Sequence, residues 1–208
     1  MSDTMVTATE RKPRDEEIDV FGLTHVGLVR PTNDDHFLLG SLHQRLEVRS
    51  TSLPADNPLR QGDERLAFLA MVADGVGGRA AGEEASRLAL EQVTQYVAQS
   101  TRCYYQEDPH AETFIDLLQE AAMRSHAAVI ERAKANSAFE GMATTLTLWI
   151  GVWPWIYLLQ VGDSRYYLYR DGELTQVTRD QTMAEDLIDQ GVMARSAAHR
   201  TRWANVLS

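Results

Sequence analysis

The residues of this chain that are best suited to chemistry are carboxylates at the ends of apolar runs. Asp74 follows the apolar run 66–73 and opens the glycine-rich segment 74–78, which reads DGVGG. A strand that ends in an aspartate, followed by residues without bulky side chains, can present that carboxylate to a metal ion. The alternative is a tight turn that Asp74 caps with its own side chain. The segment alone leaves both interpretations open.

Two further acidic segments accompany Asp74. Asp34 and Asp35 end the segment RPTNDD, and Asp163 lies in the segment GDSR. Each segment lies near the end of a predicted strand, and hard cations such as Mg²⁺ and Mn²⁺ prefer carboxylate and carbonyl oxygens. Asp35 and Asp74, on separate strands, therefore form a candidate ligand set together with the carbonyl oxygen of Gly75.

A cation lies close to these carboxylates in the sequence. Arg30 precedes Asp34 by four residues, and a guanidinium fork matches the oxygens of a phosphate group. A surface ion pair between Arg30 and an acidic neighbour is the alternative. His36 follows Asp35 and either orients a metal-bound water or has a purely structural role.

Composition limits the class of protein. The 208 residues include 44% hydrophobic and 24% charged ones, which is typical of one soluble domain with a substantial core. No apolar run approaches the roughly 20 residues of a membrane helix. The first twenty residues also lack the apolar segment of a secretory signal. We therefore expect a cytoplasmic protein with no membrane partner.

The charge and the cysteine content exclude further classes. A net charge of −10 disfavours nucleic acid as a partner, although solubility alone explains most of this charge. The single cysteine, Cys103, excludes an internal disulfide and a thiolate metal cluster.

The hydrophobic pattern predicts strands, then two helices, then more strands, which indicates an α+β domain. A disordered tail is predicted over 1–18 and a long connection over 41–64. The predicted strands are 21–29, 37–40, 66–73, 143–151, 155–161, 165–170 and 173–178. The predicted helices are 82–99, 111–135 and 182–190. The pair Asp171-Gly172 predicts a hairpin turn.

Taken together, these segments resemble the metal-dependent serine/threonine protein phosphatases of type 2C, in their bacterial form. The resemblance rests on RPTNDD at 30–35, DGVGG at 74–78, GMATT at 141–145 and GDSR at 162–165, with a hairpin-like segment over 169–180. These motifs follow one another in the order typical of the family. The resemblance implies a β-sandwich of two antiparallel sheets flanked by helices in α-β-β-α layers. It also implies that 19–208 is a partial catalytic domain that lacks its C-terminal strands.

The resemblance further implies an activity, its cofactors and its partners. The reaction is hydrolysis of phosphoserine and phosphothreonine monoesters on proteins, by water that two metal ions activate. The metals would be Mn²⁺ or Mg²⁺, two per site, and Asp163 would help to hold a third, weakly bound ion. The partners would be a phosphorylated protein and an opposing serine/threonine kinase.

Individual roles also follow from the resemblance. Arg30 would bind the substrate phosphate. Asp74 would bridge the two metals, and the carbonyl of Gly75 would bind one of them. Asp34 and Asp35 would coordinate the metals or hydrogen-bond to metal-bound water.

Three positions depart from the family pattern. Asp34 stands where the family usually has a longer glutamate. Val76 stands where many eukaryotic members have a histidine proposed as a general acid, so that role is absent here. Ala143 replaces a glycine, which is tolerated only if the backbone does not need a positive φ.

The largest departure is at the end of the sequence. The family has two later metal-binding aspartates, whereas the last aspartate here is Asp189. The resemblance therefore implies a half-built metal centre, with apolar surface and a sheet edge left uncovered. A second hypothesis follows: a truncated, catalytically weak or inactive protein that binds a phosphoprotein or a regulatory partner through Arg30 and the acidic cluster.

Overall fold

The computed structural model describes most of the chain. The described residues are 11–45, 49–50, 52, 54, 63–77, 80–100, 111–198, 201, 203 and 206–207. Cys103, Gly78 and the first ten residues of the predicted tail lie outside them. Within the rest of that tail, Asp15–Glu17 forms a 3₁₀ helix, and Asp15 forms an ion pair with Arg65.

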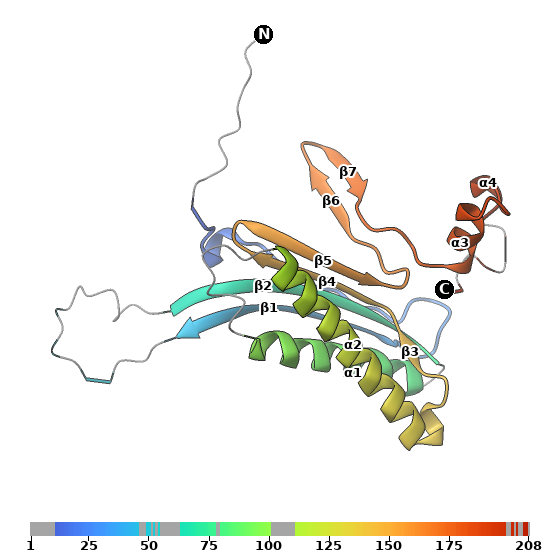
Figure 1. Ribbon diagram of the computed structural model, residues 1–208, viewed down its shortest axis with the longest axis horizontal. Helices are drawn as coiled ribbons and strands as arrows, with labels where there is room; N and C mark the ends of the chain where they lie inside the picture. The colour runs from blue at the N-terminus through green and yellow to red at the C-terminus, as the bar shows by residue number, and fades with distance from the viewer. Residues whose placement is uncertain are drawn as a thin grey trace, which may run out of the picture.

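A five-stranded antiparallel sheet forms the centre of the molecule (Figure 1). Its main strands lie in the order β1 (Asp35–Arg45), β2 (Asp63–Val76), β4 (Leu146–Val152) and β5 (Trp155–Val161). The short β3 (Ala143–Thr144) pairs with the end of β2. β1 and β2 extend into the predicted connection 41–64 from both sides, so the predicted limits of that connection were wrong.

One face of this sheet, which we call the closed face, is covered by α1 (Ala80–Gln99) and α2 (Ala111–Ala135) (Figure 1). Side chains from alternate strand positions pack under the helices, as the two-residue period of a strand requires. The ring of Phe114 on α2 stacks on that of Tyr157 on β5, with 4.7 Å between the ring centroids. The fully buried side chains of this core include those of Met71, Val93, Val97, Phe114, Leu148 and Ile150.

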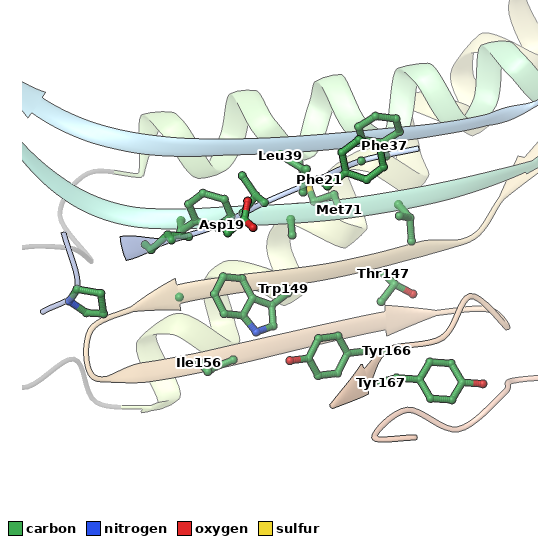
Figure 2. A pocket seen from close by; sticks show the side chains of 18 of the residues that line it. Asp19, Phe21, Phe37, Leu39, Met71, Thr147, Trp149, Ile156, Tyr166 and Tyr167 are labelled. Carbon is green, nitrogen blue, oxygen red and sulfur yellow. The ribbon is translucent and has the colours of Figure 1, made fainter. Parts of the chain in front are cut away.

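The opposite side of the sheet, which we call the open face, lacks such a cover in the described part of the chain. Its side chains line a groove of about 980 Å³ (Figure 2). Phe37, Val72 and Ile156 are 39%, 42% and 61% exposed there. The predicted strand 66–73 is thus buried on one face only, and the expected uncovered apolar surface is present.

The segment 21–29 forms no strand, so that prediction was wrong. Leu23, Leu28 and Val29 are exposed, and the segment contains a turn in which Gly27 has φ 78°. Its apolar pattern suits a strand, but a strand also needs a neighbour to share backbone hydrogen bonds. Figure 2 shows Phe21 close to Phe37, so the segment lies along the open face.

The C-terminal part begins with the hairpin of β6 (Tyr167–Arg170) and β7 (Glu173–Gln176). Its turn residues, Asp171 and Gly172, have φ values of 53° and 84°, which confirms the predicted hairpin turn. The bidentate ion pair of Arg165 with Asp180 closes the base of this hairpin.

Three short helices complete the described structure: a 3₁₀ helix, Ser137–Phe139, after α2, then α3 (Met183–Asp189) and α4 (Arg195–Ala198). The molecule is therefore α+β, with antiparallel sheets flanked by helices, as the sequence predicts. Among the described helices, none combines the length and the hydropathy needed to cross a membrane.

Candidate metal centre

Asp35, at the start of β1, and Asp74, near the end of β2, are direct cross-strand neighbours. Side chains at directly opposed positions of two strands extend on the same side of a sheet. Phe37 and Val72 continue the same alternation along the two strands and line the groove. The carboxylates of Asp35 and Asp74 therefore lie side by side at the end of the open face.

The surroundings raise the pKa of Asp74 to about 6. The largest cause is burial, followed by the negative charge of Asp35 and the hydrogen bond between the two carboxyl groups. The charge of Asp163 raises the pKa further, whereas the positive charge of Arg30 lowers it. Asp74 thus keeps its proton to a higher pH than an ordinary aspartate, because burial and the neighbouring negative charge of Asp35 both disfavour its ionised form.

Arg30 and Asp163 therefore lie close enough to Asp74 for their charges to change its pKa. The side chain of Arg30 is exposed and that of Asp163 is half-buried. The structure therefore places four of the predicted residues, Asp35, Asp74, Arg30 and Asp163, around one corner of the molecule.

Asp34 differs from these four residues. Its side chain is buried, and its Oδ2 atom lies against Gly82 in the first turn of α1. Its Oδ1 atom is buried without a hydrogen-bond partner among the described groups. The positive end of the helix dipole favours a carboxylate at this place, while the unsatisfied oxygen leaves room for a bound water or cation.

Gly75 packs directly against the same helix turn. A Cβ atom on Gly75 would lie 2.0 Å from the carbonyl oxygen of Gly82, so only glycine permits this contact. A Cβ atom on Gly82 would in turn lie 2.9 Å from the carbonyl oxygen of Gly75. The glycine after Asp74 therefore brings the end of β2 against α1.

The backbone of Asp74 is held by Thr144 and Thr145, two residues to which the sequence interpretation gave no role. The amide of Asp74 donates to Thr145 Oγ1 at 2.9 Å, and its carbonyl accepts from the Thr145 amide and the Thr144 hydroxyl. Thr145 Oγ1 also lies 2.7 Å from Ser164 Oγ, beside Asp163. The threonine pair of GMATT thus connects Asp74 to the GDSR segment. The motif GMATT was the only sequence signal that could have pointed to these two threonines.

The departures from the family pattern have structural consequences. Ala143 lies in β3 opposite Val76 and has no positive φ, so alanine fits there. Val76 is 48% exposed and cannot act as an acid or a base.

The donor chemistry of this corner fits a hard divalent cation. Two adjacent carboxylates and a buried, unpartnered carboxylate oxygen favour such an ion over an imidazole-bound or thiolate-bound metal. However, the described residues contain no group of three or more His, Cys, Asp or Glu side chains that could hold a metal ion. The described part of the chain therefore offers a carboxylate pair rather than a complete cage.

Known proteins share both the sequence and the fold. The family model for protein phosphatase 2C matches residues 49–199. The serine/threonine protein phosphatase PstP of Mycobacterium tuberculosis is 35% identical over 133 residues, which are 64% of this chain and 24% of that protein. The serine/threonine phosphatase stp of Listeria innocua is 28% identical over 139 residues, which are 67% of this chain and 53% of that protein. The matches thus span about a quarter and about half of the two relatives.

Solved structures agree with these matches. The crystal structure of M. tuberculosis PstP superimposes with a TM-score of 0.56 at 30% identity, covering 83% of this chain and 66% of that one. The PstP catalytic domain in complex with two manganese ions gives 0.58 at 31% identity, covering 83% and 60%. The structure of the S. agalactiae serine/threonine phosphatase gives a TM-score of 0.66 at 22% identity, covering 89% of this chain and 65% of that one. At this identity it supports the fold alone. From its sequence match and its fold, the chain belongs to the protein phosphatase 2C family.

Proposed function

We propose that this chain takes part in metal-dependent hydrolysis of phosphoserine and phosphothreonine monoesters on proteins. The observation that supports this most strongly is the Asp35–Asp74 pair at opposed positions of two strands, beside Arg30. Burial, and after it the charge of Asp35, raises the pKa of Asp74 to about 6. Such a corner gathers negative charge for a cation and offers positive charge for a phosphate.

In this proposal Asp35, Asp74 and the carbonyl of Gly75 would hold the catalytic cations, Mn²⁺ or Mg²⁺, at two per site. Asp163 would help to hold a third, weaker ion, and Asp34 would orient a water near the cations. The related PstP domain was solved with two manganese ions, which supports the choice of metal. The chemistry that such ions supply is activation of water and neutralisation of the phosphoryl charge. Below about pH 6, their binding would require Asp74 to release its proton.

Arg30 has the clearest substrate role in this proposal. Its guanidinium group can bind two phosphate oxygens and orient the phosphorus toward the carboxylate pair. Val76 offers no proton to the leaving alkoxide, so that proton would come from water. The substrate would be a phosphorylated protein made by an opposing serine/threonine kinase, in cytoplasmic signal transduction.

One observation favours a second candidate function. The described residues contain no group of three metal-binding side chains, so tight binding of two cations lacks support. The chain would then be a catalytically weak or inactive phosphatase-like module that binds a phosphoprotein through Arg30. The two candidates share a phosphate site and differ in turnover.

The experiment is Mn²⁺-dependent hydrolysis of p-nitrophenyl phosphate and of a phosphothreonine peptide by the 208-residue chain. We expect slow hydrolysis that Mn²⁺ stimulates. The rate should fall by at least about 100-fold in Asp74→Ala, because a principal ligand is removed. Asp116→Ala, an exposed aspartate on α2, is the matched control and should keep the wild-type rate.

Two results would decide against parts of the proposal. Equal Mn²⁺-stimulated rates in the wild type and Asp74→Ala would contradict the metal site. Saturable phosphopeptide binding that needs Arg30, without any turnover, would select the second candidate.

A further inference from the structure

Ser86 on α1 is a buried hydroxyl that faces the start of β1. Its residue is 0% exposed, and its Oγ atom lies 2.6 Å from the carbonyl oxygen of Asp34. The carbonyl oxygens of Gly82 and Glu83, one turn earlier in the same helix, are both 3.2 Å away. A serine inside a helix usually bonds to its own preceding turn. Here the shortest hydrogen bond leaves the helix and reaches the strand that bears Asp35.

The same hydroxyl has a second partner beside Asp35. Its Oγ atom lies 3.0 Å from Nδ1 of His36. A hydroxyl donates one proton and accepts with its lone pairs. With its proton on the Asp34 carbonyl, Ser86 accepts the N–H of His36. Ser86 therefore contacts the residue before Asp35 and the residue after it.

The carbonyl of Asp34 also links this contact to Asp74. It accepts a second hydrogen bond, 3.2 Å long, from the amide of Gly75, the residue after Asp74. One carbonyl oxygen thus joins α1, β1 and β2 at the point where the two carboxylates meet. Asp35 and Asp74 themselves extend on the open face, while this linkage lies on the closed face.

We infer that Ser86 is a positioning residue, which fixes the backbone on both sides of Asp35 and thereby aligns its carboxylate with that of Asp74. The inference rests on the proposed function, because the property that it controls is cation binding by this pair. Without the hydroxyl, the Asp34 carbonyl keeps only the Gly75 amide and His36 loses its buried partner. The carboxylate of Asp35 can then adopt more conformations. Cation binding has to restrict these conformations, which costs entropy and lowers the affinity.

The test is Mn²⁺ affinity of the full chain at pH 7.5, measured by electron paramagnetic resonance of free Mn²⁺. Ser86→Ala should bind Mn²⁺ about 5- to 10-fold more weakly, which is the range expected when one or two buried hydrogen bonds are lost. Ser86→Thr keeps the hydroxyl and should stay within about twofold of the wild type. Ser125→Ala removes an equally buried serine from α2 and should leave the affinity unchanged.

A separate variant tests the same linkage from the strand. His36→Phe removes the ring nitrogen and should weaken Mn²⁺ binding in the same direction as Ser86→Ala. Unfolding in EDTA, measured on each variant, separates affinity from stability. A merely structural serine would lower the unfolding free energy in Ser86→Ala and leave the Mn²⁺ affinity at the wild-type value.

The outcomes separate this inference from the proposed function. Wild-type affinity in both Ser86→Ala and His36→Phe, with binding abolished in Asp74→Ala, overturns the positioning role alone. Equal weakening in Ser86→Ala and Ser125→Ala also overturns it. Absence of Mn²⁺ binding by the wild type overturns the proposed function and the positioning role with it.

Discussion

On the closed face of the sheet, Leu148 and Ile150 are fully buried beneath two helices, whereas Val72 and Ile156 on the open face are exposed. The two faces also serve the candidate site differently. The carboxylates of Asp35 and Asp74 extend on the open face, at its end. The groups that hold their backbone, including Ser86 on α1, come from the closed face.

The carboxylates that would bind a cation thus lie on one face of the sheet, and groups that hold their backbone lie on the other. A carboxylate pair whose backbone is fixed by a packed helix can keep its geometry even where the other face of the sheet has little cover. Substitutions in the apolar core of the closed face should therefore change stability. Substitutions of the two carboxylates, or of the groups that hold their backbone, should change metal binding.

The largest effect on stability is expected at Ile150. Ile150→Ala removes a fully buried side chain from the closed face and should cost about 2–5 kcal/mol, because the packed helices cannot collapse fully onto the cavity. Urea unfolding of the metal-free chain measures this cost. A cost below about 1 kcal/mol would mean that the closed face is not the core.

A smaller effect is expected at Thr145. Thr145→Val keeps the side-chain shape but leaves the Asp74 amide and Ser164 without their hydroxyl partner, at a cost of about 1–2 kcal/mol. It should also weaken Mn²⁺ binding. Thr94→Val, whose hydroxyl bonds only to Leu90 within α1, is the control, and Mn²⁺ affinity should not change there. Identical Mn²⁺ affinities in both variants would refute the role of Thr145.

The pH dependence of stability should identify Asp74. Its pKa rises from 3.8 to about 6 on folding, so the folded state holds its proton more tightly than the unfolded state. The contribution is fully present below pH 3.8 and is lost as the pH rises through about 6. Since Asp74 is only half-buried, solvent screening reduces this contribution.

Asp74→Asn has no carboxyl group to titrate at this position, so it cannot lose this contribution to stability as the pH rises. Its unfolding free energy, measured without metal from pH 4 to pH 8, should exceed that of the wild type increasingly up to about pH 6 and by a constant amount above it. Parallel curves for the two proteins over this range would show that Asp74 does not titrate abnormally.

The smallest effect is expected at Ile156, the open-face counterpart of Ile150. Ile156→Ala should cost less than about 1 kcal/mol, because the side chain is 61% exposed before it is removed. The same urea experiment compares the two isoleucines. Equal costs for Ile150→Ala and Ile156→Ala would abolish the distinction between the faces.

Sequence reasoning succeeded where the signal was local. The apolar stripe at helical spacing predicts 111–135, and α2 has the same bounds. The Asp171-Gly172 pair predicts the hairpin turn because both residues tolerate a positive φ. Asp35 and Asp74 were also predicted to meet, from motif order and from their places at strand ends.

Sequence reasoning failed for features that depend on residues far away in the sequence. The segment 21–29 has the composition of a strand, but the described structure gives it no paired neighbour. The sequence did not indicate that the carboxylate of Asp34 lies against Gly82 of α1, because Gly82 is far from Asp34 in the sequence. Thr145 and Ser86 contact partners that are 71 and 52 residues away, so no local pattern reveals these contacts. The motif GMATT marks Thr145 as a residue of interest, but it does not name its partner.

Asp74 keeps its proton up to about pH 6, and we expect it to bind a divalent cation together with Asp35 once that proton is released. Calorimetric titration of Mn²⁺ into the metal-free chain, in buffers of different ionisation enthalpy, measures the protons released. With the pKa of Asp74 at about 6, binding should release ~0.8 proton at pH 5.5 and less than ~0.1 at pH 7.5, and Asp74→Asn should release none. Mn²⁺ binding without proton release at pH 5.5, or undiminished binding by Asp74→Asn, would contradict the claim.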